Sequence, residues 1–428
     1  MSTVAVISLI SIVVVIILGS IFKVNYGILA LVAAFICGCF LADMTPSDVI
    51  GLWGTKLFIQ MFSITFFYSF SANNGTLQLL AEKVVYATRK IPWSIPIVLF
   101  FVGAFCAGIG PGSIAAYMIL IPVYMKISRQ CQMKLPLAAI VAAHGVLAGS
   151  WTIISVNGIT IAGILESCGY SANEAAVLVN ILWKNMAIYN IGLFIIAYII
   201  FKGWKCVVPN VNRPDPFNKK QRITILLMVL LLASVIIFQL LQIIANNSII
   251  TWIADKADIS MLALLFGCIA SLCKLGDEKE IFLSIPWKTI IMVCGMGVLI
   301  SVASEIGVME AISNFVSNSF TTQIIPFVLC VIAGIMSLFS STMGVVVPTL
   351  FPIAISIALT GDGNISLFLS AIVMGSVSTG DSPFSLCGGL IQAGTADEDK
   401  NRIFYTLIII AFAALIWALM LILLGVIS

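Results

Sequence analysis

Apolar runs of about twenty residues recur along the whole chain, and they restrict its possible folds more than any other feature. A helix of this length crosses the hydrocarbon core of a bilayer. Lipid offers no partner for backbone N–H and C=O groups, so such runs are expected to be helical. With 61% hydrophobic and 9% charged residues, the composition excludes a soluble domain. The sequence therefore predicts an all-α polytopic membrane protein, with spans near residues 4–22, 26–42, 55–72, 135–165, 175–201, 223–243, 259–273, 289–304, 365–394 and 403–427.

Two further apolar stretches, 94–127 and 324–358, carry polar or Gly/Pro residues at their centres. The central residues are Gly108–Ser113 in the first and Ser340–Gly344 in the second. Each arm of roughly 13–14 residues would rise only about 20 Å as a helix, which is short of the ~30 Å hydrocarbon core. We therefore expect both stretches to form re-entrant helical hairpins.

Two of the spans are too polar at their centres to be plain helices. Residues 375–389 read GSVSTGDSPFSLCGG inside the span 365–394, and residues 145–158 read GVLAGSWTIISVNG inside the span 135–165. Backbone groups freed by a helix break cost several kcal/mol in lipid, but they are tolerated where they line a watery cavity. Both spans are therefore predicted to be broken helices that form a site.

The two halves of the chain correspond to each other. Pro122 and Pro352, Gly145 and Gly375, and Gly158 and Gly388 are each 230 residues apart. The sequence predicts a first repeat at 1–202, a basic linker at 203–222 and a second repeat at 223–428. Since each repeat has five spans, the two are expected to be inverted in the membrane, a plan common among secondary transporters.

Charge gives an orientation and removes several function classes. All but three of the 21 Lys and Arg residues fall on one predicted face, which the positive-inside rule makes cytoplasmic, with both termini outside. We expect a bacterial cytoplasmic (inner) membrane protein with lipid around it and no nucleic-acid partner. The 11 cysteines form no CxxC pair and there is one histidine, so no cofactor and no metal beyond a possible Na⁺ is expected. The sequence contains no Ser/His/Lys dyad, HExxH motif or aspartate pair, so we do not expect an enzyme.

The hairpin tips and helix breaks are expected to bring several helix ends near the bilayer centre. Helix N-termini suit anions, while carbonyl and hydroxyl oxygens suit Na⁺. The alternative for each hydroxyl is a bond back to its own helix. The candidate substrate-binding residues are Ser113, Ser150, Thr152, Asn157, Ser341, Thr342, Thr379, Ser382 and Ser385. The candidate ion-coupling residues are Gly110, Ser155, Ser340, Ser378, Gly380 and Asp381.

Three further positions have two interpretations each. Asp381 is the one carboxylate within the broken spans, and it either binds Na⁺ or a proton or caps the half-helix that starts at Ser382-Pro383. His144 is either a packed hydrogen-bonder or a contact for a proton or the substrate. Asn74 and Gly75, together with Gly307, form either a plain elbow or a hinge.

The order of NNGT, a hairpin, AAHGVLAGSWTIISVNG, SSTMGVVVPTLFP and GDSPFSLCGG resembles the malonate/dicarboxylate carriers of the MatC type. These belong to the ion-transporter superfamily that also holds the sodium-coupled divalent-anion symporters. The resemblance covers nearly the whole chain. It implies a homodimer with a fixed scaffold and a moving transport domain, working as an elevator.

The expected function is secondary active transport of a small carboxylate, such as malonate or a C4-dicarboxylate, coupled to Na⁺ or H⁺. One alternative is the large membrane subunit of a binding-protein-dependent (TRAP-like) carrier. Another is an ion or metalloid-anion exchanger of the same superfamily. The second break keeps Asp, Pro and hydroxyls where the first has Trp151, so the better-formed ion site is expected in the second half.

Overall fold

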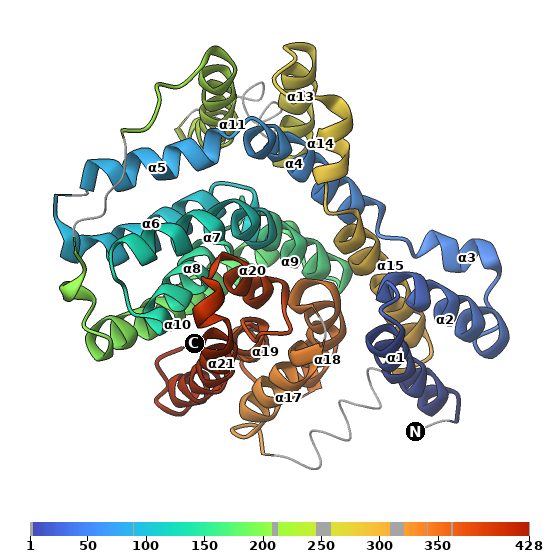
Figure 1. The fold of residues 1–428 in the computed structure, drawn as a ribbon. Coiled ribbons are helices and arrows are strands. Elements are labelled where there is room, and N and C mark those ends of the chain that lie inside the picture. The colour runs from blue at the N-terminus through green and yellow to red at the C-terminus, as the bar shows by residue number, and fades with distance from the viewer. Residues whose placement is uncertain are drawn as a thin grey trace. The chain divides into compact units, whose positions relative to one another are not determined.

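The computed structural model describes residues 3–88, 90–207, 213–244, 258–308, 321–339, 341–360 and 363–427. Within these residues the chain is helical and contains no strand, which confirms the all-α expectation. The helices follow the predicted spans closely, because each apolar run ends at a polar, Gly or Pro residue. They are α1 (Thr3–Phe22), α2 (Tyr26–Leu41), α3 (Pro46–Gly51), α4 (Thr55–Asn73), α5 (Thr76–Thr88), α6 (Ile95–Gly108), α7 (Gly112–Gln130), α8 (Leu135–Gly149), α9 (Val156–Ser167), α10 (Ala172–Ile200), α11 (Lys219–Ile244), α13 (Ile259–Leu272), α14 (Glu278–Ser284), α15 (Trp287–Glu305), α17 (Ile325–Phe339), α18 (Val347–Thr360), α19 (Ile365–Gly380), α20 (Leu386–Gly394) and α21 (Lys400–Leu423) (Figure 1).

Several of these helices can cross a bilayer. In the described part of the chain, five are long and apolar enough by length and composition. They are Pro46–Asn73, Ala172–Ile200, Trp287–Glu305, Thr342–Leu359 and Asn401–Leu423. Shorter apolar helices accompany them, including α2, α8 and α19. The chain is therefore an integral membrane protein.

The contacts divide the chain into two compact units. The first unit comprises residues 1–58, 160–196 and 287–428, and the second comprises 59–159 and 197–286. This division follows packing, so it does not test the sequence repeat, whose boundaries at 202 and 222 remain predictions. Each unit is described by itself below.

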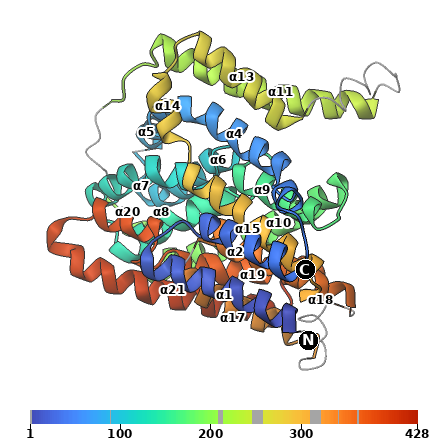
Figure 2. The same cartoon turned by 90° about the vertical axis from the view of Figure 1, so that its right-hand side faces the viewer.

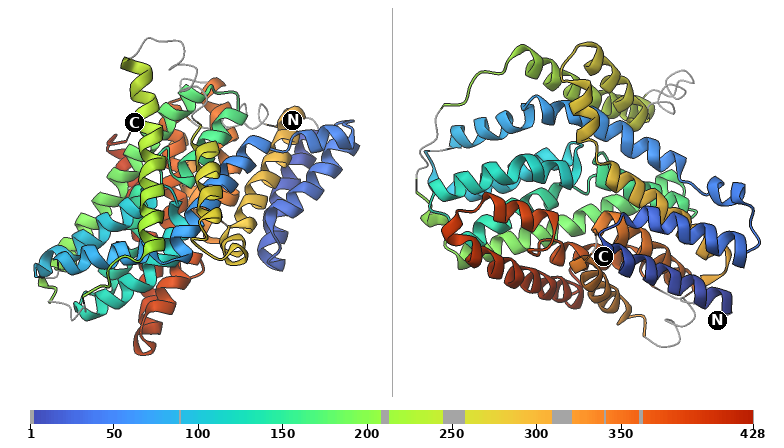
Figure 3. Two further views of the ribbon diagram at one scale, coloured as in Figure 1. Left: turned by 90° about the horizontal axis from the view of Figure 1, so that it is seen from above. Right: turned by 45° about the vertical axis from the view of Figure 1, so that its right-hand side comes forward.

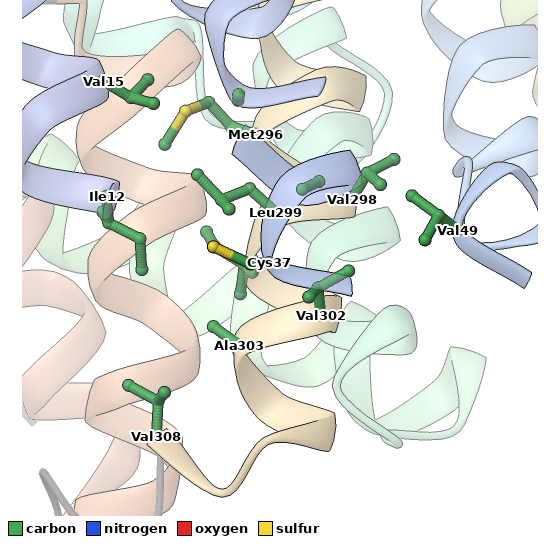
Figure 4. Close-up of a cluster of buried hydrophobic side chains, with 13 residues drawn as sticks. Ile12, Val15, Cys37, Val49, Met296, Val298, Leu299, Val302, Ala303 and Val308 are labelled. Carbon is green, nitrogen blue, oxygen red and sulfur yellow. The ribbon is translucent and has the colours of Figure 1, made fainter. Parts of the chain in front are cut away.

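In the first unit, α2 packs directly against the backbone of α15 (Figure 3). A Cβ added at Gly27 would lie 2.2 Å from the carbonyl oxygen of Ile291, and one at Gly295 would lie 2.3 Å from that of Gly27. This contact is continuous with a cluster of buried side chains from α1, α2 and α15 (Figure 4). Met296 and Leu299 are fully buried in it. Lipid is as apolar as these side chains, so close packing and the short approach of the two backbones, rather than removal from water, hold the three helices together.

The second unit holds α6, α7 and α8, and its outer part holds α4, α5, α11 and α13. Figure 2 shows α11 and α13 running side by side. α6 and α8 touch backbone to backbone, since a Cβ at Gly149 would lie 1.8 Å from the carbonyl oxygen of Ala104. Larger residues at such positions would separate the two helices.

The repeat seen in the sequence is present in the local packing. A Cβ at Gly145 would lie 2.9 Å from the carbonyl oxygen of Phe100, and a Cβ at Gly375 would lie 2.0 Å from that of Cys330. Both members of the second pair are 230 residues after those of the first. In each half, a hairpin helix therefore crosses a broken helix at the same glycine.

The hairpin arms are longer than the sequence argument assumed. α6 has 14 residues and α17 has 15, as expected, but α7 has 19. In the second hairpin the helix already begins at Thr342 with a π-helical turn and continues through α18 to Thr360. Arms of this length rise about 28 Å, so the prediction of two short arms was wrong for the second arm of each hairpin. The reason is that α7 runs on through its polar residues to Gln130, while residues counted as the second tip are helical.

The span predicted at 223–243 begins earlier in the structure than in the sequence prediction. α11 begins at Lys219 rather than after Arg222. Asn218 and Gln221 exchange hydrogen bonds between side chain and backbone N–H at 2.9 and 3.0 Å, which is a capping arrangement. This cap starts the helix four residues before the apolar run.

Candidate functional site

The first break separates α8 from α9 over residues 150–155. Ser155 restarts the helix: its hydroxyl donates to the carbonyl of Thr152 at 2.8 Å and accepts from the N–H of Gly158 at 3.1 Å. A Cβ at Gly158 would lie 2.0 Å from the carbonyl oxygen of Thr152, so only glycine fits there. The hydroxyl of Ser150 bonds back to the carbonyl of Val146 at 2.6 Å.

The first hairpin tip turns at Gly110 and Gly112, whose φ values are +154° and +69°. The side chain of Tyr68 closes this tip, since its hydroxyl donates to the carbonyl of Ile109 and its ring lies 1.9 Å from where a Cβ of Gly110 would be. Glycine is therefore required at Gly110 by both conformation and space.

The first tip and the first break are joined by hydrogen bonds. The N–H of Val156 donates to the carbonyl of Gly110 at 2.9 Å, and the hydroxyl of Thr152 donates to that of Gly108 at 2.5 Å. The amide of Asn157 donates to the hydroxyl of Ser113 at 3.1 Å, and both side chains are buried. The candidate residues of this half-site therefore contact one another, as expected, and use their polar atoms in doing so.

The second break, over residues 381–385, repeats this backbone path. The hydroxyl of Ser385 donates to the carbonyl of Ser382 at 2.8 Å and accepts from the N–H of Gly388 at 3.0 Å. A Cβ at Gly388 would lie 2.1 Å from the carbonyl oxygen of Ser382. The helix after the break is thus capped by Ser385, and Asp381 follows the last residue of the helix before it.

The second tip meets α19 through hydroxyl groups. Ser376 donates to the hydroxyl of Thr342 at 2.7 Å, and the hydroxyl oxygen of Ser337 lies 3.4 Å from that of Thr342. Among the described residues, a Cβ at Gly380 would approach only these hydroxyls, at 3.6 Å from Thr342 and 3.7 Å from Ser337. Ser341 caps the π-helical turn by accepting from the N–H of Gly344 at 3.3 Å. The result is a group of hydroxyl oxygens around the end of α19.

Asp381 and Ser382 place buried oxygens at this second break. Each is 2% exposed. Within the described residues, the hydroxyl of Ser382 has no hydrogen-bond partner. A buried hydroxyl without a partner costs free energy unless a ligand or water completes it. Carboxylate and hydroxyl oxygens together suit a small hard cation.

The cap interpretation of Asp381 is not the one the structure supports. The residue that accepts from the next helix is Ser385, four residues later, and Asp381 instead ends α19. The turn 382–385 separates Asp381 from the start of α20, which sequence spacing to Pro383 did not reveal. Whether Asp381 binds an ion stays a prediction.

The other predicted residues have these positions. The hydroxyl of Thr379 donates to the carbonyl of Gly334 at 2.7 Å, which joins α19 to α17. Ser378 bonds back to the carbonyl of Met374 at 2.6 Å, as the alternative interpretation expected. His144 is fully buried in α8. Ser340 lies outside the described residues. The two half-sites lie in different compact units.

The predicted hinge residues lie at bends between helices, and hydrogen bonds hold one of these bends in place. Gly75 and Gly307 both have positive φ, at +72° and +82°, as expected for glycines that end helices. The side-chain amide of Asn74 donates to the hydroxyl of Thr224 at 2.8 Å, and the backbone carbonyl of Asn74 accepts from the side chain of Gln221 at 3.0 Å. These bonds attach the elbow between α4 and α5 to α11. Motion at the elbows stays a prediction.

Several polar residues near the second break were not among the predicted site residues. Ser376 lies within the second break sequence, residues 375–389, and Ser337 lies one turn before the second tip. In α10, Asn185, Tyr189 and Asn190 are fully buried. Their signal was available, because asparagine recurs every five residues in an otherwise apolar span. The span contains no helix break, whereas the site residues were predicted from tips and breaks.

Comparisons with known proteins agree with this arrangement. Residues 1–150 match the family described as "Dicarboxylate carrier protein MatC N-terminus", and residues 249–427 match the family described as "Citrate transporter". The search of curated proteins gives no match. Among solved structures, the YdaH transporter of Alcanivorax borkumensis, described as having an unusual topology, matches with a TM-score of 0.60.

That structural match covers 88% of this chain and 86% of the YdaH chain at 12% sequence identity, so it shows the fold alone. The fold of this chain is similar to the fold of that protein. The two family matches name carriers rather than enzymes, and both concern carboxylates. The resemblance to MatC-type dicarboxylate carriers is thereby confirmed for residues 1–150, and residues 249–427 are similar to citrate transporters.

Proposed function

We propose that this protein is a secondary active transporter of small di- or tricarboxylates that is driven by a cation bound at the second break. The family matches support a carrier of carboxylates. The observation that carries the coupling is the buried pair of Asp381 and Ser382 at the end of a broken helix. Burying an ionisable residue in a membrane protein costs free energy, so we expect it to have a functional partner.

Na⁺ fits this pair of residues better than H⁺. A proton needs only the carboxylate, whereas the hydroxyl of Ser382 offers a second oxygen that no described residue uses. The hydroxyls of Thr342 and Ser376 lie close to the same helix end. Several oxygens of this kind replace the hydration shell of a small hard cation.

A substrate carboxylate is assigned to the start of α20, in the same compact unit as the proposed cation. Ser385 caps this helix, and the N–H groups of its first turn can stabilise an anion. Malonate and C4-dicarboxylates are the first substrates to test, and citrate is the next because of the match over 249–427. Transport by an elevator motion of a homodimer in a bacterial inner membrane, with both termini outside, completes the proposal.

Uptake into proteoliposomes tests this function. The purified chain is reconstituted and given radiolabelled malonate, succinate or citrate, with an inward Na⁺ gradient, an inward H⁺ gradient or neither. We expect accumulation of at least one of these acids with the Na⁺ gradient. Failure of every carboxylate under every gradient would rule the proposal out.

The same assay separates the alternatives. Uptake by the chain alone excludes a carrier that depends on a soluble binding protein. A proton flux that follows the Na⁺ gradient without any carboxylate would instead indicate an ion exchanger.

A further inference from the structure

Helix α10 carries three fully buried polar side chains that neither the tips nor the breaks require: Asn185, Tyr189 and Asn190. They lie in the same compact unit as the second break. Asn185 and Tyr189 are four residues apart, so they share one face of the helix. Buried polar groups are retained where hydrogen bonds compensate for the lost water. Their contacts therefore indicate their role.

Tyr189 reaches the second broken helix. Its hydroxyl oxygen lies 2.7 Å from that of Ser378 in α19. The hydroxyl of Ser378 already donates its single hydrogen to the carbonyl of Met374 at 2.6 Å. Tyr189 is therefore assigned as the donor in the pair and Ser378 as the acceptor, because the other acceptor near the tyrosine hydroxyl, the carbonyl of Ala414, is further away at 3.4 Å.

Tyr189 is itself held in place from α21. The indole N–H of Trp417 donates to the carbonyl of Tyr189 at 3.0 Å. Gly192, one turn further along α10, lies beneath the same indole, where a Cβ would be 2.6 Å from the ring. The tyrosine thus reaches α19 from a fixed backbone.

The contact falls where it can act on Asp381. Ser378 lies in the last turn of α19, three residues before Asp381. A hydrogen bond that fixes Ser378 fixes the turn from which the carboxylate projects.

The first break has no such contact available. The residue 230 positions before Ser378 is Ala148, and the one before Ser370, which accepts from Asn185 at 2.8 Å, is Ile140. Neither has a hydroxyl. The hydroxyls that α10 binds are therefore particular to the broken helix that carries Asp381.

We propose that Tyr189 is a positioning residue for the cation site of the second break, acting through Ser378. This inference rests on the cation assigned to Asp381 under the proposed function. Tyr189 does not touch the cation. It holds the last turn of α19 in the geometry in which Asp381 and Ser382 bind Na⁺, and so sets the affinity for Na⁺.

The test is a NaCl titration of the purified full-length protein, read as its thermal unfolding temperature, with choline chloride holding the ionic strength constant. A ligand at concentration L that binds only the folded state stabilises it by RT ln(1 + L/Kd), so fitting the unfolding temperature against the Na⁺ concentration gives the half-saturating Na⁺ concentration, here called the Na⁺ midpoint. We expect Tyr189→Phe, which keeps the ring, to raise the half-saturating Na⁺ concentration about five- to tenfold, the effect of one buried hydrogen bond. Ser378→Ala should give the same shift, and the double variant should add little to it.

Asn185→Ala is the matched control, because it removes a hydrogen bond between the same two helices two turns further from Asp381. It should lower the unfolding temperature without Na⁺ but leave the Na⁺ midpoint unchanged. An unchanged midpoint in Tyr189→Phe, an equal shift in Asn185→Ala, or no Na⁺ response in the unmodified protein would each overturn the inference. Carboxylate uptake is measured separately, so its absence alongside a shifted Na⁺ midpoint would count only against the proposed substrate class.

Discussion

The two broken helices have the same backbone path and different chemistry. At both, a serine four residues into the break caps the next helix and a glycine three residues later packs on a carbonyl. Yet the residue that begins the turn is Trp151 in the first and Asp381 in the second, and both are almost completely buried. One half supplies an indole and the other supplies a carboxylate at the matched position.

This difference shows that a repeated scaffold does not require repeated sites. The first tip is joined to its break by the pairs Val156–Gly110 and Asn157–Ser113, which use polar atoms within the protein. At the second break, the hydroxyl of Ser382 has no partner in the described chain. Glycine and serine thus give the two broken helices the same backbone path, while Asp381 in place of a tryptophan is the difference on which the proposed cation site depends.

The largest expected effect comes from removing the acidic side of this comparison. Asp381→Asn keeps the size of the side chain and removes its charge, so Na⁺-driven carboxylate uptake should fall about 100-fold or more. Trp151→Phe should change it less than about threefold, because the described structure shows no hydrogen bond from the indole that would be lost. Uptake into proteoliposomes measures both, with thermal unfolding to confirm that each variant folds. Normal coupling in Asp381→Asn would remove the assigned role from Asp381.

A smaller effect is expected where the broken helices cross the hairpins. Gly375→Ala would place its methyl group 2.0 Å from a carbonyl oxygen, whereas Gly145→Ala would place it 2.9 Å away. We expect a loss of about 3 kcal/mol for the former and about 1 kcal/mol for the latter, read as the order of their unfolding temperatures. Gly389→Ala is the control, since no described residue lies within 4 Å of its added methyl group. A reversed order would mean that the two crossings are not packed as described.

The smallest effect concerns the element that the two breaks share. Ser155→Ala and Ser385→Ala each remove a helix cap, and each should cost about 1 kcal/mol of stability. Thermal unfolding of the two variants should therefore give nearly equal decreases. A decrease in unfolding temperature confined to one variant would show that the two caps do not stabilise their helices equally.

The sequence was sufficient for the helices, the two breaks and their correspondence. Each of these depends on local chemistry: apolar runs of spanning length, and glycine, serine and proline where a helix cannot continue. The match of Gly145 with Gly375 supported the predicted repeat, and the structure adds that both glycines pack against a hairpin helix.

Contacts between distant segments were beyond the sequence argument. The bond from Tyr189 to Ser378 joins residues 189 positions apart, and nothing in either local pattern indicates the other. The cap interpretation of Asp381 failed for a related reason, because composition does not show which of several polar residues starts the helix. The predicted lengths of the second hairpin arms were wrong because the helix continues through polar residues such as Thr342.

Binding of radioactive Na⁺ to the purified protein tests the central claim most directly, because it needs neither a substrate nor a membrane gradient. The unmodified protein and Trp151→Phe should bind Na⁺ with similar affinity, and Asp381→Asn should not bind it over the same concentration range. Undiminished binding by Asp381→Asn, or loss of binding in Trp151→Phe alone, would contradict the assignment of the cation to the second break.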